Sequence, residues 1–140
     1  MDFEMVLLEL QKQGITGCSQ IMAKLGMDLV GQDNPGLIRA MSGLTGGMGD
    51  AGSACGVLTG GAAAIGYLAG KGEEGEIPHE DYKEIIRKYV EWFKETYDTD
   101  RCYDIIKGDK VYSKEVCPGI IEAGYYKMVE LLDEYGVLEE

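Results

Sequence analysis

The stretch YKEIIRKYVEWFKETY, residues 82–97, carries the clearest helical pattern in the chain. Its apolar side chains recur every three or four residues, while Glu, Lys and Arg occupy the opposite face. Weaker stripes of the same kind predict further helices over residues 3–10 (ending at Gly14), 18–29, 35–44, 53–69 and 118–135, with a short helical turn at 100–106. No stretch shows sustained strand alternation, so the sequence predicts an all-α fold.

Residues 51–70 form an uncharged segment of 20 residues, which is long enough to span a bilayer. Gly, Ala, Ser and Thr dominate it, and Gly52, Gly56 and Gly60 recur every four residues, a spacing that lets helices approach closely. This composition favours a buried central helix over a membrane span. We therefore expect a single domain over residues 1–140, a compact bundle of about five to seven helices around this Gly/Ala-rich helix.

Charge and histidine content exclude several classes of function. The chain has 140 residues with 13 Lys+Arg against 25 Asp+Glu, a net charge of −12, and a single His. Nucleic acids and anionic membranes bind clustered basic side chains, so neither is an expected partner. The single His argues against His-rich metal sites and against a Ser-His-Asp hydrolase. A hydrolase or transferase in general has little support, because no acid/base pair lies next to a recognisable nucleophile. The acidic N-terminus lacks the basic region of a secretory signal, which predicts a cytoplasmic protein.

The chemistry-bearing residues of the chain are its four cysteines. They are Cys18, Cys55, Cys102 and Cys117. No C-x-x-C pair is present, but each cysteine lies where a helix is expected to begin. The expected N-caps are Thr16, Ser53, Asp100 and Cys117 itself, the last because Pro118 suits the first helical position. A helix N-terminus stabilises a thiolate, so we expect lowered thiol pKa values.

The four cysteines have a purely structural interpretation as well as a functional one. A single free cysteine is commonly a small buried apolar residue, and a helical module with buried cysteines would need no chemistry. In a reducing compartment, however, four thiols at helix starts indicate metal ligands or redox centres. The set therefore favours redox or metal chemistry.

At these residues the sequence resembles the redox-active protein family named for the pattern C…GCAxxG…C…C. The likeness consists of a cysteine opening an early helix (residues 17–20), a Gly-rich approach (46–52), a cysteine in a small-residue helix (54–60) and two late cysteines. The central motif departs from the pattern, because Ala precedes Cys55, Gly follows it and the later Gly lies one place further on.

The resemblance implies a helical protein of redox or electron-transfer function, an oxidoreductase or an electron carrier with a redox partner protein. It nominates Cys18, Cys55, Cys102 and Cys117 as ligands of an iron–sulfur cluster or as redox-active thiols. Zinc is a less favoured occupant of the same thiolate set. The alternatives are a metal-free thiol–disulfide protein and a structural module, and the small-residue helix faces leave a homodimer open.

Two further signals receive ordinary interpretations. Residues 47–52 spell G-x-G-x-x-G, but a dinucleotide site needs a preceding strand, and residues 38–42 have a helical pattern. We expect a tight connection that brings backbone close to Cys55. His79 follows Pro78 among acidic residues, which predicts a surface position.

Overall fold

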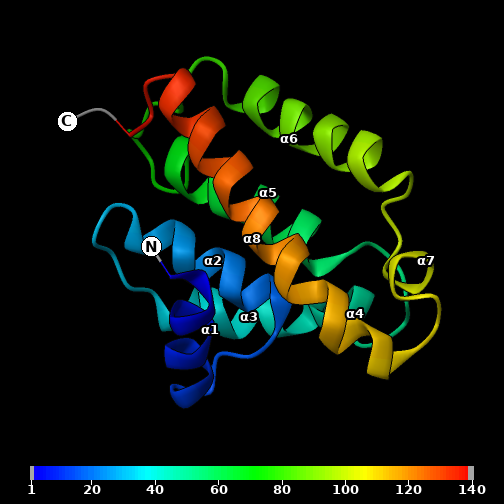
Figure 1. Cartoon of the computed structure of the whole chain (residues 1–140). Coiled ribbons are helices and arrows are strands. Elements are labelled where there is room, and N and C mark those ends of the chain that lie inside the picture. Colours follow the sequence, from blue (N-terminus) through cyan, green and yellow to red (C-terminus); the bar gives the residue numbers. More distant parts are fainter. Residues whose placement is uncertain (1, 139–140) are drawn as a thin grey trace.

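The computed structural model describes residues 2–138, and its regular structure within that range is helical (Figure 1). The elements are α1 (Phe3–Lys12), α2 (Cys18–Asp28), α3 (Pro35–Met41), a 3₁₀ turn (Ser42–Leu44), α4 (Thr45–Met48), α5 (Gly56–Ala69), α6 (Tyr82–Tyr97), α7 (Cys102–Ile106) and α8 (Lys110–Glu134). The only pairing of extended backbone among these residues is an isolated bridge between Ala54 and Arg101. The predicted all-α fold is confirmed.

The segment α4 differs from the other helices because its backbone is left-handed. Gly46, Gly47 and Gly49 have φ values of 64°, 72° and 65°, and Met48 and Asp50 continue the run at 68° and 66°. Glycine adopts this region without penalty, whereas a side chain makes it costly. Without α4, seven right-handed α-helices lie within residues 2–138, which agrees with the predicted five to seven.

Helix α5 forms the centre of the bundle and contacts α2, α6 and α8 (Figure 1). It begins at Gly56 rather than at the predicted Ser53, because Cys55 has a non-helical backbone (φ −58°, ψ 134°) and takes the N-cap position. Its buried residues include Val57, Ile65 and Ala69, so the prediction of a buried central helix is confirmed. Among the residues that the structure describes, no helix is long and apolar enough to cross a membrane.

Missing side chains allow α2 and α5 to pack closely. A Cβ atom on Gly60 would lie 2.6 Å from the Cα of Ser19, and one on Gly26 would lie 2.7 Å from the Cβ of Ala64. Both distances are shorter than real Cβ contacts, so only glycine fits. Gly52, which the sequence placed in the same repeat, lies before the helix with a φ of 74°.

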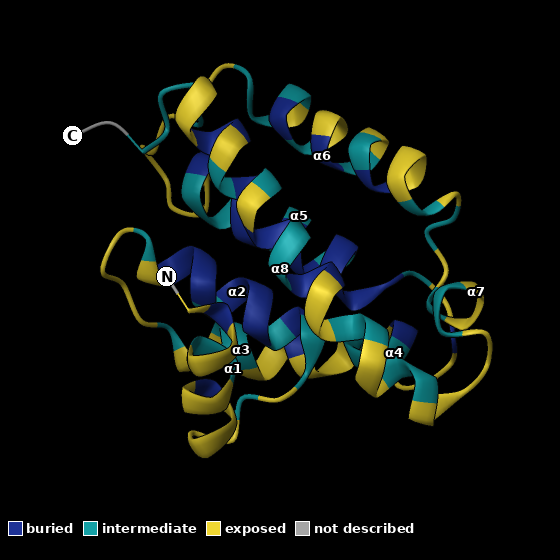
Figure 2. Cartoon of the chain, viewed as in Figure 1, coloured by how far each residue is buried: buried dark blue, intermediate teal, exposed yellow. Residues whose placement is uncertain are grey.

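Helix α6 covers α5 with one face and presents the other face to solvent (Figure 2). Ile85, Tyr89 and Phe93 are fully buried on the inner face. The Tyr89 hydroxyl donates a 2.7 Å hydrogen bond to the carbonyl of Val57, and burial raises its pKa. The stripe that identified this helix in the sequence is therefore the face that contacts the central helix.

The start of α8 corrects a prediction. The helix begins at Lys110, eight residues before Pro118, and Pro118 lies inside it. The Asp109 carboxylate is the cap, since it accepts hydrogen bonds from the backbone N–H groups of Val111 and Tyr112 at 2.9 and 3.3 Å. Cys117 consequently lies two turns inside a helix and is not an N-cap.

Candidate functional site: a cavity lined by four cysteines

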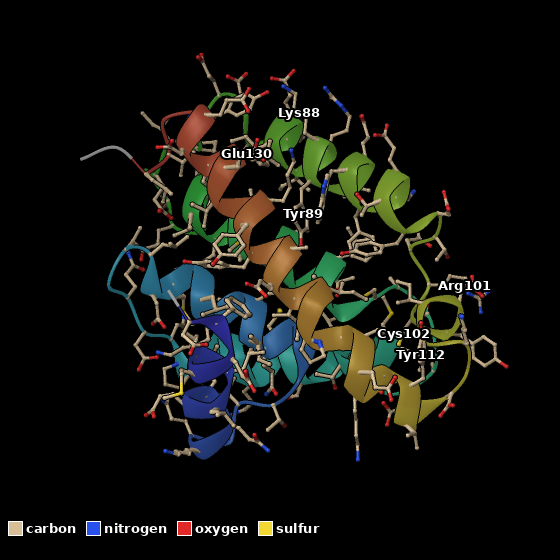
Figure 3. All side chains as sticks on the ribbon, viewed as in Figure 1. Lys88, Tyr89, Arg101, Cys102, Tyr112 and Glu130 are labelled. Atoms are coloured by element: carbon tan, nitrogen blue, oxygen red, sulfur yellow. The ribbon has the colours of Figure 1, made fainter. Side chains whose placement is uncertain are left out.

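The structure brings all four predicted site residues to one cavity of about 950 Å³. Its wall is built from α1, α2, α5, α7 and α8 together with the left-handed turn. Cys55 is buried, and the other three cysteines are half-buried. Figure 3 labels Cys102 at the start of α7 and Tyr112 in the first turn of α8. Residues separated by most of the chain length therefore share one chemical environment.

Cys18 is the first residue of α2 and is fixed by its neighbours in the chain. Gly17 is the N-cap, and its backbone N–H donates a 3.2 Å hydrogen bond to the Gln20 side chain. The predicted cap, Thr16, is displaced by one residue. A Cβ atom on Gly56 would collide with the Cys18 sulfur, so this glycine makes room for the thiol at the start of α5.

Cys55 and Cys102 are held by a short antiparallel pairing around the Ala54–Arg101 bridge. The N–H of Cys55 donates to the carbonyl of Asp100 at 2.7 Å, and the N–H of Cys102 donates to the carbonyl of Ser53 at 2.6 Å. Side chains alternate along paired extended segments, so both cysteines, one position from the bridge, lie on the same side of it.

The two cysteines of this pairing also begin helices, although with different caps from those predicted. Cys55 is the N-cap of α5 in place of Ser53, and Cys102 is the first residue of α7, with Arg101 rather than Asp100 as its cap. Three of the four cysteines therefore lie at helix starts. Cys117 does not, because α8 begins two turns before it.

Burial raises the pKa of three of the thiols, which corrects the prediction of lowered values. The pKa rises to about 12 for Cys55 and to about 11 for Cys117, and it also rises for Cys102. Loss of water is the main cause, and repulsion from the neighbouring thiols adds to it in each case. Without a bound cation these thiols are protonated near pH 7.

The left-handed turn packs against the paired segments that carry Cys55 and Cys102. A Cβ atom on Gly47 would lie 2.7 Å from the Cβ of Cys102 and 2.6 Å from the backbone nitrogen of Ser53. The N–H of Ser53 donates to the carbonyl of Gly47 at 3.0 Å, which ties the turn to the paired segment. The G-x-G-x-x-G stretch is thus a tight connection, as predicted, and helical residues rather than a strand precede it.

The thiols share the cavity without closing around a single point. Among residues 2–138, no three Cys, His, Asp or Glu side chains gather closely enough to hold one metal ion. His79, predicted at the surface, is half-buried, and its Nε2 lies 2.9 Å from the carbonyl of Tyr135 rather than near the cavity. The possible metal donors in the cavity wall are the four thiols and the Asp50 carboxylate.

Two lysines in the cavity wall were not predicted from the sequence. Lys110 and Lys114 line it from α8, on the same side of the helix as Cys117. Positions 110, 114 and 117 are spaced i, i+4, i+7, so they lie on one face of a helix. Recognising Asp109 as the N-cap would have placed all three positions in the same helix and so predicted this face.

Comparison with known proteins identifies the family. No curated protein and no solved structure matches the chain. One family model does, over residues 16–131, a range that contains all four cysteines. It covers most of the chain, so this protein belongs to the family described as "Putative redox-active protein (C_GCAxxG_C_C)".

Proposed function

We propose that this protein transfers electrons through an iron–sulfur cluster held by Cys18, Cys55, Cys102 and Cys117. The observation that supports it is the convergence of these four thiols, from four different helices, on one cavity. Membership of a family described as redox-active agrees with it. Four cysteine thiolates are the usual ligand set of [2Fe–2S] and [4Fe–4S] clusters.

A single ion and a cluster require different spacings of the four sulfurs. A lone tetrahedral zinc needs four sulfurs about 2.3 Å from one point. In this cavity no three such donors meet around one point within the described residues. Cluster ligands bind different metal atoms of the same inorganic core, so their sulfurs stand further apart. The bound cluster would supply one-electron transfer.

The surrounding residues would bind and tune such a cluster. Cys18 and Cys55 lie at the N-termini of α2 and α5, where free backbone N–H groups favour negative charge. The apolar wall that raises the thiol pKa values also excludes water, and both effects act on the reduction potential. Metal binding must displace the thiol protons, so loading releases protons into solution.

The proposal is tested on protein purified without oxygen, by measuring iron, acid-labile sulfide and zinc per chain together with the visible spectrum. We expect iron and sulfide in matching amounts and absorbance that bleaches on reduction. Replacing Cys117 with Ala should reduce the iron content, while His79→Ala, far from the cavity, should not. Stoichiometric zinc, or no metal after anaerobic reconstitution, would contradict the proposal.

A metal-free thiol–disulfide protein is the second candidate. It is favoured by the placement of Cys55 and Cys102 on one side of the same backbone pairing, and by the Cys18 sulfur beside the first residue of α5. Diamide oxidation followed by peptide mapping tests it. Reversible formation of one defined disulfide in iron-free protein supports this candidate, and four thiols that stay reduced exclude it.

A further inference from the structure

The cysteines occupy only part of the cavity that they line. Its volume of about 950 Å³ is at the upper end of the range of small-molecule sites, which runs from about 300 to 1,000 Å³. The wall reaches from Leu7 on α1 to Lys110 at the start of α8. Four thiols and a compact inorganic core do not require a space of that extent, so room remains for another molecule.

The remaining wall is predominantly apolar. Branched aliphatic side chains from five helices form it: Leu7, Ile21, Val57, Ile105, Ile106, Ile120 and Ile121. Ile105 and Ile106 come from the short helix α7 and are half-buried. Tyr103, next to them, is 57% exposed. A surface of this kind favours an organic molecule with an apolar body.

The charge of the wall is opposite in sign to that of the protein. Its charged residues are Asp50, Lys110 and Lys114. Lys110 and Asp50 pair with each other at 3.4 Å. Lys114 has no carboxylate within 4.0 Å among residues 2–138. Lys114 is itself exposed, so it adds one positive charge without a close carboxylate to the solvent-accessible part of an otherwise apolar wall, in a chain with a net charge of −12.

We propose that the cavity binds a small organic anion with an apolar body, such as an aromatic or branched aliphatic carboxylate, beside the thiols. The aliphatic side chains of α7 and α8 contact the apolar body, and Lys114 binds the anionic group. This site goes beyond the proposed electron-transfer function, since its formation does not require a cluster. If the cluster is present, it places this ligand next to the redox centre.

A different role for Lys114 is the main competing explanation. Its positive charge would also offset the negative charge of four thiolates and their metal ions, with no second ligand present. The two explanations predict different experimental results. A charge-compensating lysine alters metal retention or reduction potential, whereas a ligand-binding lysine discriminates an anion from a neutral molecule of the same shape.

The test uses the full chain, purified without oxygen and with its iron content measured on the same sample. Fluorescence titration with anilinonaphthalene sulfonate, an apolar anion, should show saturable binding of one molecule per chain. Phenylbutyrate should displace the dye about threefold more effectively than neutral phenylbutanol, the gain expected from one solvent-accessible ion pair. Near-UV circular dichroism confirms that the protein stays folded during the titration.

Two variants and one matched control locate the site. Lys114→Gln should weaken dye binding about threefold and remove the preference for phenylbutyrate over phenylbutanol. Lys107→Gln makes the same charge change seven residues earlier, where the ammonium lies 5.1 Å from the Tyr112 ring and outside the cavity wall, and should leave binding unchanged. Ile106→Trp should fill the cavity and abolish binding. Ile106 lies outside the main apolar core, so the larger side chain should not disturb the packing of that core.

The proposal is overturned if the folded protein does not bind the dye saturably, or if the acid and the alcohol displace it equally well. Equal weakening by Lys114→Gln and Lys107→Gln would also overturn it, because general electrostatics would then explain the effect. The iron measurement separates this result from the cluster proposal. Iron-free protein that binds the anion keeps the ligand site and loses the cluster.

Discussion

Met48, in the left-handed turn beside the site, has a side chain in unfavourable backbone geometry. It has a φ of 68° within a run of glycines, and it is 46% exposed, so few contacts compensate for the strain. We predict that Met48→Gly stabilises the protein by about 1 kcal/mol, the cost of a side chain in a left-handed backbone. Urea unfolding followed by circular dichroism measures the change.

At the neighbouring Gly49 the opposite change, the addition of a side chain, can be tested. It has a φ of 65°, and a Cβ atom there would meet no atom within 4 Å. Gly49→Ala should therefore lower the free energy of unfolding by about 1 kcal/mol through backbone strain alone. If both variants shifted stability in the same direction, the left-handed turn would not be the cause.

Cys55 should be slow to react in metal-free protein. Burial raises its pKa from 9.0 to about 12, so at pH 8 the thiolate population falls about a thousandfold. Iodoacetamide labelling followed by mass spectrometry, with and without urea, measures the difference. Because folding raises this pKa, the stability of the folded chain should also fall as the pH rises from about 9 towards 12, since the unfolded chain releases the Cys55 thiol proton first. Labelling of the folded chain at the unfolded rate would contradict the shift.

The close contact between α2 and α5 gives a prediction at the level of elements. Gly60→Ala would place a methyl group 2.6 Å from the Ser19 backbone, which has little freedom to move. Overpacking of this kind costs about 1–3 kcal/mol, so the melting temperature should fall. Since Ser19 follows Cys18 directly, the variant should also retain less metal.

Gly66 serves as the matched control for Gly60 because it lies in the same helix. A Cβ atom at Gly66 would meet nothing within 4 Å. Gly66→Ala should stabilise the protein by about 0.5–1 kcal/mol through helix propensity. A fall in stability comparable to that of Gly60→Ala would mean that α5 is sensitive to any added side chain.

Helices with a strong apolar stripe were predictable from the sequence, and α6 coincides with its predicted range. The start of α8 was not, because Pro118 imitates a first helical position. A proline inside a helix costs about 3 kcal/mol, yet α8 extends eight residues ahead of Pro118 to Lys110. The Asp109 carboxylate stabilises this earlier start, because it accepts hydrogen bonds from the N–H groups of Val111 and Tyr112.

The convergence of the cysteines was predictable only in outline. Helix starts and family resemblance nominated the four residues that line the cavity. The pairing of Ser53 and Cys55 with Asp100 and Cys102 was not visible, because a single bridge is too short to produce strand alternation. The raised pKa values were missed for a related reason, since burial depends on which helices cover the thiols.

For the whole molecule, the proposed cluster should act as a cross-link between α2, α5, α7 and α8. A ligand that binds only the folded chain stabilises it by mass action. Removing the metal with a chelator under anaerobic conditions should therefore lower the melting temperature, and reconstitution with iron and sulfide should restore it. Chelation should lower the melting temperature of the Cys117→Ala variant only slightly. Equal melting temperatures with and without metal would mean that the thiols do not hold a shared group.

The distribution of the four thiols along the chain also sets an order of events during synthesis. Cys117 lies 99 residues after Cys18, so at about 5–20 residues per second the last thiol emerges roughly 5–20 s after the first. Until then the cavity lacks α8, and a nascent chain offers an incomplete ligand set. A proposed cluster would consequently find its complete ligand set only after the part of α8 that carries Cys117 has been synthesised.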